Sequence, residues 1–171
     1  MISFLVFSGI ISQIQPLVSL NMTKVFFDKM KPEYLDQIHQ LEINNYPVPW
    51  SKGIIKDCIR SDYHGVVLKN SQQSIIGYAF LMTACDESHL LNMCVDKGQQ
   101  GQGLGRKFLR YLENLGKYNR CKVFLLEVRE SNTVAKNLYQ SFGFEVVGIR
   151  KGYYKTLTGR ENAIVMTKAL L

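Results

Sequence analysis

A glycine-rich stretch in the middle of the chain is the first feature whose residue types could do chemistry. Residues 90–106 read LLNMCVDKGQQGQGLGR, an apolar run that leads into a glycine-rich turn, and a helix-like pattern follows at once. The first backbone N–H groups of a helix have no partner within it, and they lie at the positive end of its dipole. This turn therefore suits a phosphorylated ligand, although a glycine-rich turn of this kind is often only a tight connection.

Two familiar phosphate-binding motifs do not fit this turn. A Walker A loop needs Lys and then Ser or Thr after its second glycine, whereas Leu104 and Gly105 follow Gly103. A dinucleotide fingerprint needs its third glycine where Arg106 stands. The pattern that does fit is Gln/Arg-x-x-Gly-x-Gly, which begins here at Gln100.

Two titratable side chains could carry proton transfer. Glu127 is the one carboxylate in the apolar run 122–128, and burial would raise its pKa above ~4.3, making it a better base near neutral pH. Tyr139, a phenol with an ordinary pKa of ~10, could donate a proton to a leaving group of similar basicity. Each also has a purely structural interpretation. Glu127 could pair with Arg129 or an arginine nearer the C-terminus, and Tyr139 could be a core residue of an amphipathic helix.

Composition and charge narrow the class of protein. A chain of 171 residues with 46% hydrophobic and 20% charged residues is typical of one globular domain. The formal net charge of +7 suits nucleic acid, a membrane surface or a polyanionic small molecule. Because there is no run of Lys or Arg interleaved with aromatic residues, nucleic-acid binding is the weaker interpretation.

The cysteines and histidines form no pattern typical of a metal site or a disulfide framework. The cysteines are widely spaced, lack a C-x-x-C pair and lie among apolar neighbours, so we expect small buried residues in a reducing, cytoplasmic protein: Cys58, Cys85, Cys94 and Cys121. We expect structural or surface roles for the three histidines, and no metal: His39, His64 and His89.

The beginning of the chain differs from the rest. Residues 2–11 are almost wholly apolar but too few to cross a bilayer, which takes ~20 residues, and they lack the features of a secretory signal. The patterned sequence starts at Met22. We therefore interpret residues 1–21 as an upstream extension or the product of a misplaced translation start, and residues 22–171 as one domain. The mass of the native protein would test this.

Alternating strands and helices are predicted to position the candidate residues. Hydrophobic periodicity and turn residues predict strands at 24–29, 65–68, 75–83, 89–95, 122–128, 144–149 and 163–169. Caps and apolar stripes predict helices from Pro32 to about Asn44, after Ser51, from the glycine-rich turn to Lys117, and from Ser131 or Asn132 to Gly143. The order β-α-α-β-β-β-α-β-α-β-β predicts an α/β fold with a mixed central sheet and helices on both faces.

With this order, the chain resembles the GNAT (Gcn5-related) N-acetyltransferases, and within them the RimI group of ribosomal-protein-alanine N-acetyltransferases. The resemblance covers residues 23 to the C-terminus and rests on four segments: PWS at 49–51, residues 92–95 with the glycine-rich turn, LEVRESNTVAKNLYQSFGF at 126–144, and the RxxYYxxxxGRENA pattern from Arg150. It implies a GNAT fold and a cytoplasmic enzyme that uses acetyl-CoA without a metal. The implied acceptor is the N-terminal alanine of protein eighteen of the small ribosomal subunit.

The resemblance also implies roles for particular residues. Glu127 matches the general base, acting through water, and Tyr139 the general acid of a direct transfer. Backbone groups of three residues would pair with the pantetheine arm: Met93, Cys94 and Val95. Backbone N–H groups of the turn would hold the pyrophosphate: Gly101, Gln102, Gly103, Leu104, Gly105 and Arg106. Asn132 matches a position that contacts acetyl-CoA. Gly101 is a departure, because close relatives often have a basic residue there.

The acceptor is less narrowly indicated. An α-amino group has a pKa of ~7.7–8.0 and a lysine side chain ~10.4, so deprotonating lysine costs ~3–4 kcal/mol more and one carboxylate base suits an N-terminus better. Trp50, Tyr153 and Tyr154 are candidates for a peptide groove, or for ordinary packing. The alternatives are another amine acceptor, such as other protein N-termini, a polyamine or a small-molecule amine, and a non-catalytic acetyl-CoA-binding module. Direct contact with nucleic acid or membrane is not expected.

Overall fold

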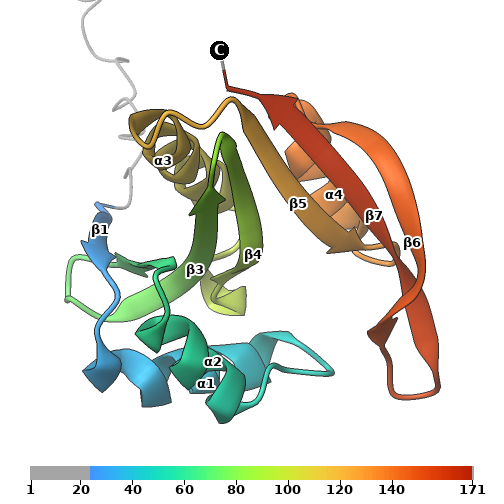
Figure 1. The fold of residues 1–171 in the computed structure, drawn as a ribbon. Helices are drawn as coiled ribbons and strands as arrows, with labels where there is room; N and C mark the ends of the chain where they lie inside the picture. The colour runs from blue at the N-terminus through green and yellow to red at the C-terminus, as the bar shows by residue number, and fades with distance from the viewer. Residues whose placement is uncertain (1–23, 171) are drawn as a thin grey trace, which may run out of the picture.

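A seven-stranded mixed sheet positions the predicted site in the computed structural model, which describes residues 24–170 (Figure 1). The strands lie side by side in the order β1-β2-β3-β4-β5-β7-β6, and only β4 and β5 run parallel. Their bounds are β1 Phe26–Lys29, β2 His64–Lys69, β3 Ile75–Ala84, β4 Glu87–Val95, β5 Val123–Arg129, β6 Glu145–Lys155 and β7 Arg160–Ala169. The predicted extension, residues 1–21, lies outside the described residues.

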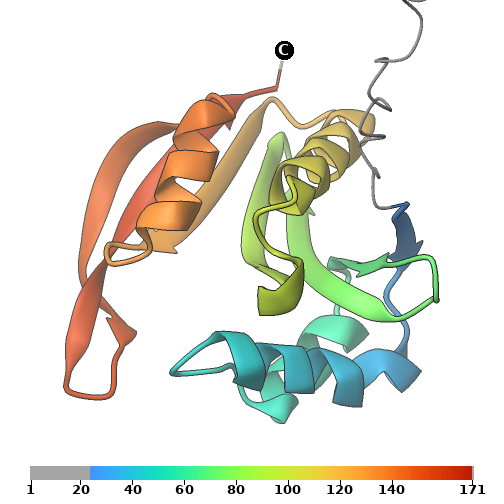
Figure 2. The same ribbon diagram turned by 180° about the vertical axis from the view of Figure 1, so that it is seen from behind.

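Helices cover both faces of the sheet, as predicted (Figures 1 and 2). On one face lie α1 and α2, and on the other α3 and α4. Each pair has its own buried apolar cluster against the strands, centred on Ile38 and Ile55 for the first pair and on Phe108 and Leu126 for the second. The bounds are α1 Leu35–Asn45 after a 3-10 turn at Pro32–Tyr34, α2 Lys52–Arg60, α3 Leu104–Tyr118 after a 3-10 turn at Lys97–Gln99, and α4 Thr133–Ser141.

The two central parallel strands separate halfway along their length. β4 pairs with β5 only from Glu87 to Leu90, opposite Val123 to Leu126. Immediately afterwards the pairing of β4 with β3 slips by one residue, so that Leu91 is a bulge between Leu90 and Asn92. A bulge bends its strand and increases its twist. The end of β4 therefore turns away from β5 and opens the sheet at its centre.

The predicted element order is confirmed, with differences in detail. Ser51 caps α2, Asn132 rather than Ser131 caps α4, and Gly143 follows α4 with a φ of 95°. The last two strands are longer than predicted, because β6 and β7 continue as a bulged hairpin through the polar residues 150–162.

One expectation about the cysteines is wrong. Cys94 and Cys121 are buried and Cys58 is half-buried, but Cys85 is exposed. Cys85 lies in the turn between β3 and β4 with a φ of 53°, where the chain reverses beyond the ends of these strands and the side chain is exposed. Within residues 24–170, no helix is long and apolar enough to cross a bilayer.

Candidate active site

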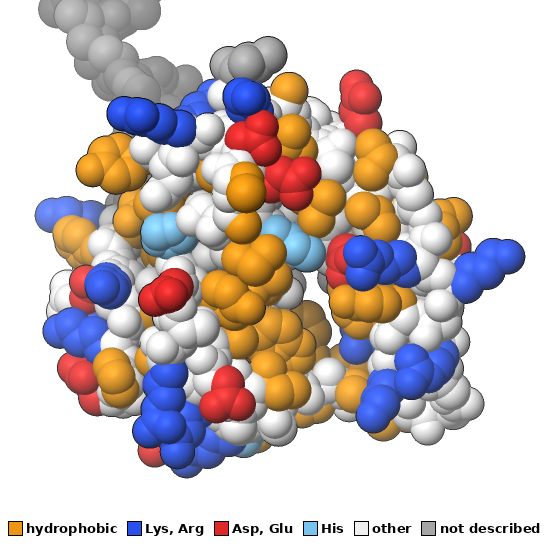
Figure 3. Space-filling view, viewed as in Figure 1, with side chains coloured by type: hydrophobic (Ala, Val, Ile, Leu, Met, Phe, Trp, Pro, Cys, Tyr) orange, Lys and Arg blue, Asp and Glu red, His pale blue; other side chains and the backbone are white. Residues whose placement is uncertain are grey.

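A cavity of about 680 Å³ fills the opening between β4 and β5. Its walls are the ends of these strands, the glycine-rich turn, α4 and the loop between α1 and α2. Figure 3 shows that hydrophobic side chains gather at the middle of this face, beside a hollow that separates them from the region of β6 and β7. The cavity brings together all the predicted site residues except Gln102: Met93, Cys94, Val95, Gly101, Gly103, Leu104, Gly105, Arg106, Glu127, Asn132 and Tyr139.

Side chains from both faces of the sheet line the cavity. Leu126 and Val128 lie in the apolar cluster beneath α3 and α4, which also contains Tyr139. Because side chains alternate along a strand, Glu127 points to the opposite face, where α1 and the hairpin lie. A ligand on the α3–α4 face and another on the α1 face could therefore meet between the strands.

The glycine-rich turn presents backbone donors on the α3–α4 face. Gly103 caps α3 with a φ of 74°, and the first bond runs from the Lys107 N–H to the Gly103 carbonyl at 3.1 Å. The N–H groups of the first residues of α3, from Leu104 to Arg106, therefore have no partner within the helix. A Cβ on Gly101 or Gly103 would meet nothing within 4 Å, so glycine is required there by its left-handed backbone and not by crowding.

The open edge of β4 offers alternating backbone groups to the cavity. The Tyr46 hydroxyl donates to the Met93 carbonyl at 2.9 Å, and Gln100 Nε2 donates to the Val95 carbonyl at 2.9 Å. The backbone of Met93 and Val95 therefore faces the cavity edge. The Cys94 carbonyl instead faces β3, because a Cβ on Gly77 would lie 2.7 Å from it.

Glu127 is buried and paired with a cation. Its side chain is 8% exposed, and its Oε1 lies 3.0 Å from Nη1 of Arg150, which is 56% exposed. The pairing with an arginine nearer the C-terminus is one of the two structural interpretations above. Arg129, the other, instead pairs with Glu161 at 2.7 Å. Pairing alone does not exclude proton transfer, because the carboxylate still lines the cavity.

The two adjacent tyrosines of the hairpin also lie against Glu127. Burial, and then a hydrogen bond with the Glu127 side chain, raise the pKa of Tyr153. The Tyr154 hydroxyl donates to the Glu127 carbonyl at 3.1 Å, and the Arg129 guanidinium lies 4.5 Å from the centre of the Tyr154 ring. Tyr154 and Trp50 line the cavity, as the peptide-groove interpretation requires, and Tyr153 lies beside it.

On the other side of the opening, α4 supplies Tyr139 and Asn132. Tyr139 is 7% exposed and its ring packs edge-on against Phe144. Burial raises the pKa of Tyr139 to about 12, so its hydroxyl keeps its proton throughout the neutral range. The Asn132 side chain caps the helix by accepting from the Ala135 N–H at 3.0 Å.

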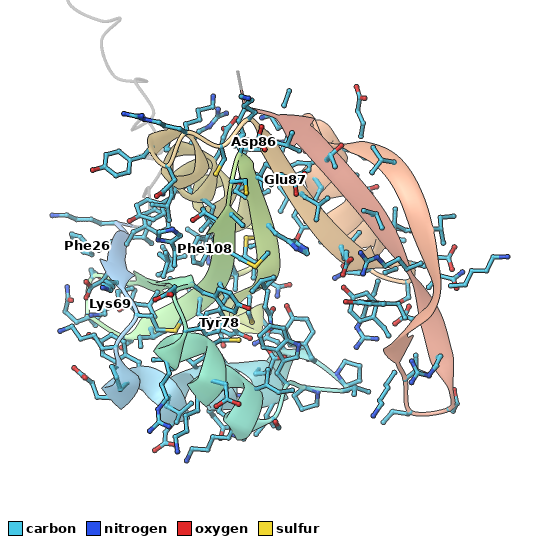
Figure 4. All side chains as sticks on the ribbon, in the orientation of Figure 1. Phe26, Lys69, Tyr78, Asp86, Glu87 and Phe108 are labelled. Carbon is cyan, nitrogen blue, oxygen red and sulfur yellow. The ribbon has the colours of Figure 1, made fainter. Side chains whose placement is uncertain are left out.

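Glu42 is a second buried carboxylate in the cavity wall, and the sequence analysis missed it. It is 2% exposed and accepts hydrogen bonds from the Trp50 N–H at 2.8 Å, the Tyr78 hydroxyl and Asn92 Nδ2 at 3.5 Å. Tyr78 reaches it from β3, on the side of the sheet covered by α1 and α2 (Figure 4). The available signal was spacing, since Glu42 follows Ile38 by four residues on the apolar stripe of α1.

Comparison with known proteins agrees with the family that the sequence resembles. Residues 61–146 match the family described as Acetyltransferase (GNAT) domain. The chain is 39% identical over 133 residues to the [ribosomal protein bS18]-alanine N-acetyltransferase of Haemophilus ducreyi, which covers 77% of this chain and 90% of that protein. It is 34% identical over 132 residues to the enzyme of the same name from Escherichia coli K12, covering 77% and 88%.

Solved structures show the same fold. The crystal structure of the ribosomal-protein-S18-alanine N-acetyltransferase from Escherichia coli superposes with a TM-score of 0.80 at 31% identity, covering 86% of this chain and 94% of that one. Ard1 from Thermoplasma volcanium superposes with a TM-score of 0.77 at 19% identity, covering 86% and 98%, a likeness of fold alone.

Proposed function

The chain belongs to the GNAT acetyltransferases and, within them, to the RimI group, and we propose that it acetylates the N-terminal alanine of ribosomal protein bS18. The relatives named for that reaction are matched over nearly their whole length. The observation that carries the mechanism is the placing of a buried carboxylate, Glu127, and a buried phenol, Tyr139, in the walls of one cavity.

Acetyl-CoA is the proposed acetyl donor, and the cavity suits it in size and in chemistry. A volume of about 680 Å³ is in the range of small-molecule sites, which is roughly 300–1,000 Å³. The amides from Leu104 to Arg106 supply donors for the pyrophosphate, at the positive end of α3. The backbone of Met93 and Val95 would bind the pantetheine arm as an added strand. The Tyr46 hydroxyl and the Gln100 amide would then exchange their present bonds for bonds with the arm.

The hydrogen bonds of Arg106 and Asn132 decide which of their atoms we assign to acetyl-CoA. The guanidinium of Arg106 donates to Oγ of Ser141 at the end of α4, so we assign its backbone N–H, and not its side chain, to the phosphates. The carbonyl oxygen of the Asn132 amide is used by the helix cap, so the amide nitrogen is the atom proposed to contact acetyl-CoA.

Glu127 is the proposed general base. It points to the α1 face, so the amine would approach from there, while the thioester would lie between the strands. The carboxylate would accept a proton from the amine, directly or through one water, as the nitrogen attacks the thioester carbonyl. An amine with a pKa of ~7.7–8.0 needs only modest assistance, which fits an N-terminal acceptor better than lysine.

Tyr139 is the proposed general acid. It lies on the α3–α4 side of the opening, where the leaving sulfur would be. Its proton would pass to the sulfur as the C–S bond breaks, which leaves neutral coenzyme A thiol. A phenol whose pKa is raised to about 12 is fully protonated before the reaction. It can therefore serve as a donor at any pH near neutrality.

Mass spectrometry after incubation with acetyl-CoA would test this function. The acceptors would be a peptide copying the N-terminus of bS18, a lysine peptide with a blocked N-terminus, and a polyamine. Acetylation confined to the terminal alanine is expected. Acetylation of only the other amines would overturn the substrate, and binding of acetyl-CoA without transfer to any amine would favour a binding module.

A further inference from the structure

The side chain of Glu127 faces an exposed cation at the rim of the cavity. Nη1 of Arg150 lies 3.0 Å from Glu127 Oε1, and more than half of the arginine side chain is exposed, whereas the glutamate is buried. The guanidinium also lies 5.4 Å from the centre of the Tyr153 ring, beside it on β6. Arg150 therefore bridges solvent and the buried carboxylate on the face from which an acceptor would approach.

Other polar groups face Glu127, but they do not bring a comparable charge. Burial is the main cause that lowers the pKa of His89 on β4, so this imidazole is neutral at neutral pH. Tyr153 and Tyr154 on β6 are neutral phenols, because burial raises the pKa of both. Arg129, which lies on β5 with Glu127, pairs with Glu161. Within residues 24–170, Arg150 is thus the cation paired with Glu127.

We propose that Arg150 is a positioning residue for acetyl transfer, which holds the Glu127 carboxylate oriented toward the incoming amine. This inference rests on the proposed function, because it assigns Arg150 a task only if Glu127 is the base. An ion pair at 3.0 Å restricts the rotation of the carboxylate in the cavity wall.

The exposure of Arg150 limits the size of this effect. Because water solvates much of the guanidinium, the pair is weaker than a fully buried one. An ordinary ion pair between strands would instead contribute only to the stability of the fold.

A split between kcat and KM separates these two roles. Without the guanidinium the carboxylate is less well placed for the amine, so kcat should fall while acetyl-CoA binds as before. For Arg150→Gln we expect a loss of about fivefold in kcat, from the worth of a partly exposed pair, with an unchanged KM for acetyl-CoA. Arg150→Lys keeps the charge and should recover most of kcat. Lys151→Gln, which removes a neighbouring exposed cation, should behave as the wild type.

Measurements on the wild type, Arg150→Gln, Arg150→Lys and Lys151→Gln would use acetyl-CoA and the bS18 peptide. An unchanged kcat in Arg150→Gln, or a loss that Arg150→Lys does not recover, would overturn the inference. Were Arg150→Gln not to fold, Arg150→Met, which keeps an unbranched stem without the charge, would take its place with the same loss expected. In a Glu127→Gln background, replacing Arg150 should lower residual kcat no further, and a further loss would contradict the proposal. A wild type that transfers nothing overturns the proposed function as well, whereas an active wild type confines failure to Arg150.

Discussion

Two buried glutamates line the same cavity, and their surroundings differ. Glu42 accepts from the Trp50 N–H, the Tyr78 hydroxyl and the Asn92 amide, three donors held by secondary structure or by the loop that it anchors. Each of these donors would lose a partner if the carboxylate moved. Glu42 therefore holds three different segments together, and we assign it a structural role in the cavity wall.

Glu127 has a different set of partners. It pairs with the exposed guanidinium of Arg150 and bonds with Tyr153, and its Oε1 forms no hydrogen bond of good geometry within the described residues. A buried acceptor that is incompletely satisfied costs free energy, roughly 1–3 kcal/mol, unless a ligand supplies the donor. Burial alone therefore does not distinguish the two carboxylates. What distinguishes Glu127 is burial together with an incomplete set of donors in the wall of a cavity.

The largest effect is expected from Glu127→Gln. The amide keeps the shape of the side chain but cannot accept a proton, so kcat/KM should fall by about 10³, within the usual range for a general base. The free energy of unfolding should change by less than about 1 kcal/mol, because the lost pair is with an exposed arginine. Steady-state kinetics and urea unfolding would measure both quantities, and a loss of stability without loss of activity would reverse the two roles.

A smaller effect is expected from Tyr139→Phe on the other side of the opening. The ring keeps its contact with Phe144, but the proton for the leaving thiolate is lost, so kcat should fall by roughly 10². Because the pKa of Tyr139 is about 12, its hydroxyl stays protonated as pH rises to about 10. The wild type should therefore show no loss of kcat from this group between about pH 7 and pH 10. A wild-type basic limb in this range that disappears in Tyr139→Phe would contradict that assignment.

The sequence predicted Glu127 and the element order, because both depend on local patterns. A single carboxylate in an apolar strand is visible without any tertiary information. Its partner was predicted only as Arg129 or an unspecified arginine nearer the C-terminus, because Arg150 reaches it across β7, through register shifts of the β6–β7 hairpin that leave no trace in periodicity. The separation of β4 from β5 was also hidden. It starts at the bulge at Leu91, which lies within a continuous apolar run and looks like any other strand residue.

Glu42 was missed for a related reason. Its helix has a polar composition, LDQIHQLEINN, and a glutamate there is usually exposed to solvent. It becomes buried because Tyr78 and Asn92, from β3 and β4, lie beneath α1 in the folded chain. Those contacts join residues 36 and 50 positions apart, which local spacing does not predict.

Glu42→Gln should affect stability more than chemistry. The amide nitrogen would face one of the donors that now bind an oxygen, so we expect a loss of about 2 kcal/mol, typical of bonds to a charged group. The fall in kcat/KM should stay below about tenfold, because the residue acts only through the position of Trp50. Urea unfolding of this variant and of Glu33→Gln, an exposed glutamate in the turn before α1 that is expected to be neutral, would measure the difference. A thousandfold loss of activity with unchanged stability would make Glu42 the reactive carboxylate.

The smallest effect is expected from Asn92→Ala, which tests whether the donors around Glu42 support one another. The Asn92 amide donates to Tyr78 at 3.1 Å and to Glu42 at 3.5 Å, the longest of the three bonds to that carboxylate. Its removal leaves Glu42 two shorter bonds, so the loss should be about 1 kcal/mol or less. Gln40→Ala, which removes an exposed amide on α1, is the matched control. A loss larger than that of Glu42→Gln would mean that Asn92, and not the carboxylate, organises this wall. A loss of stability near that of the control would show that Glu42 keeps its role after one donor is removed. Glu127, in contrast, is expected to lose activity when Arg150 is replaced.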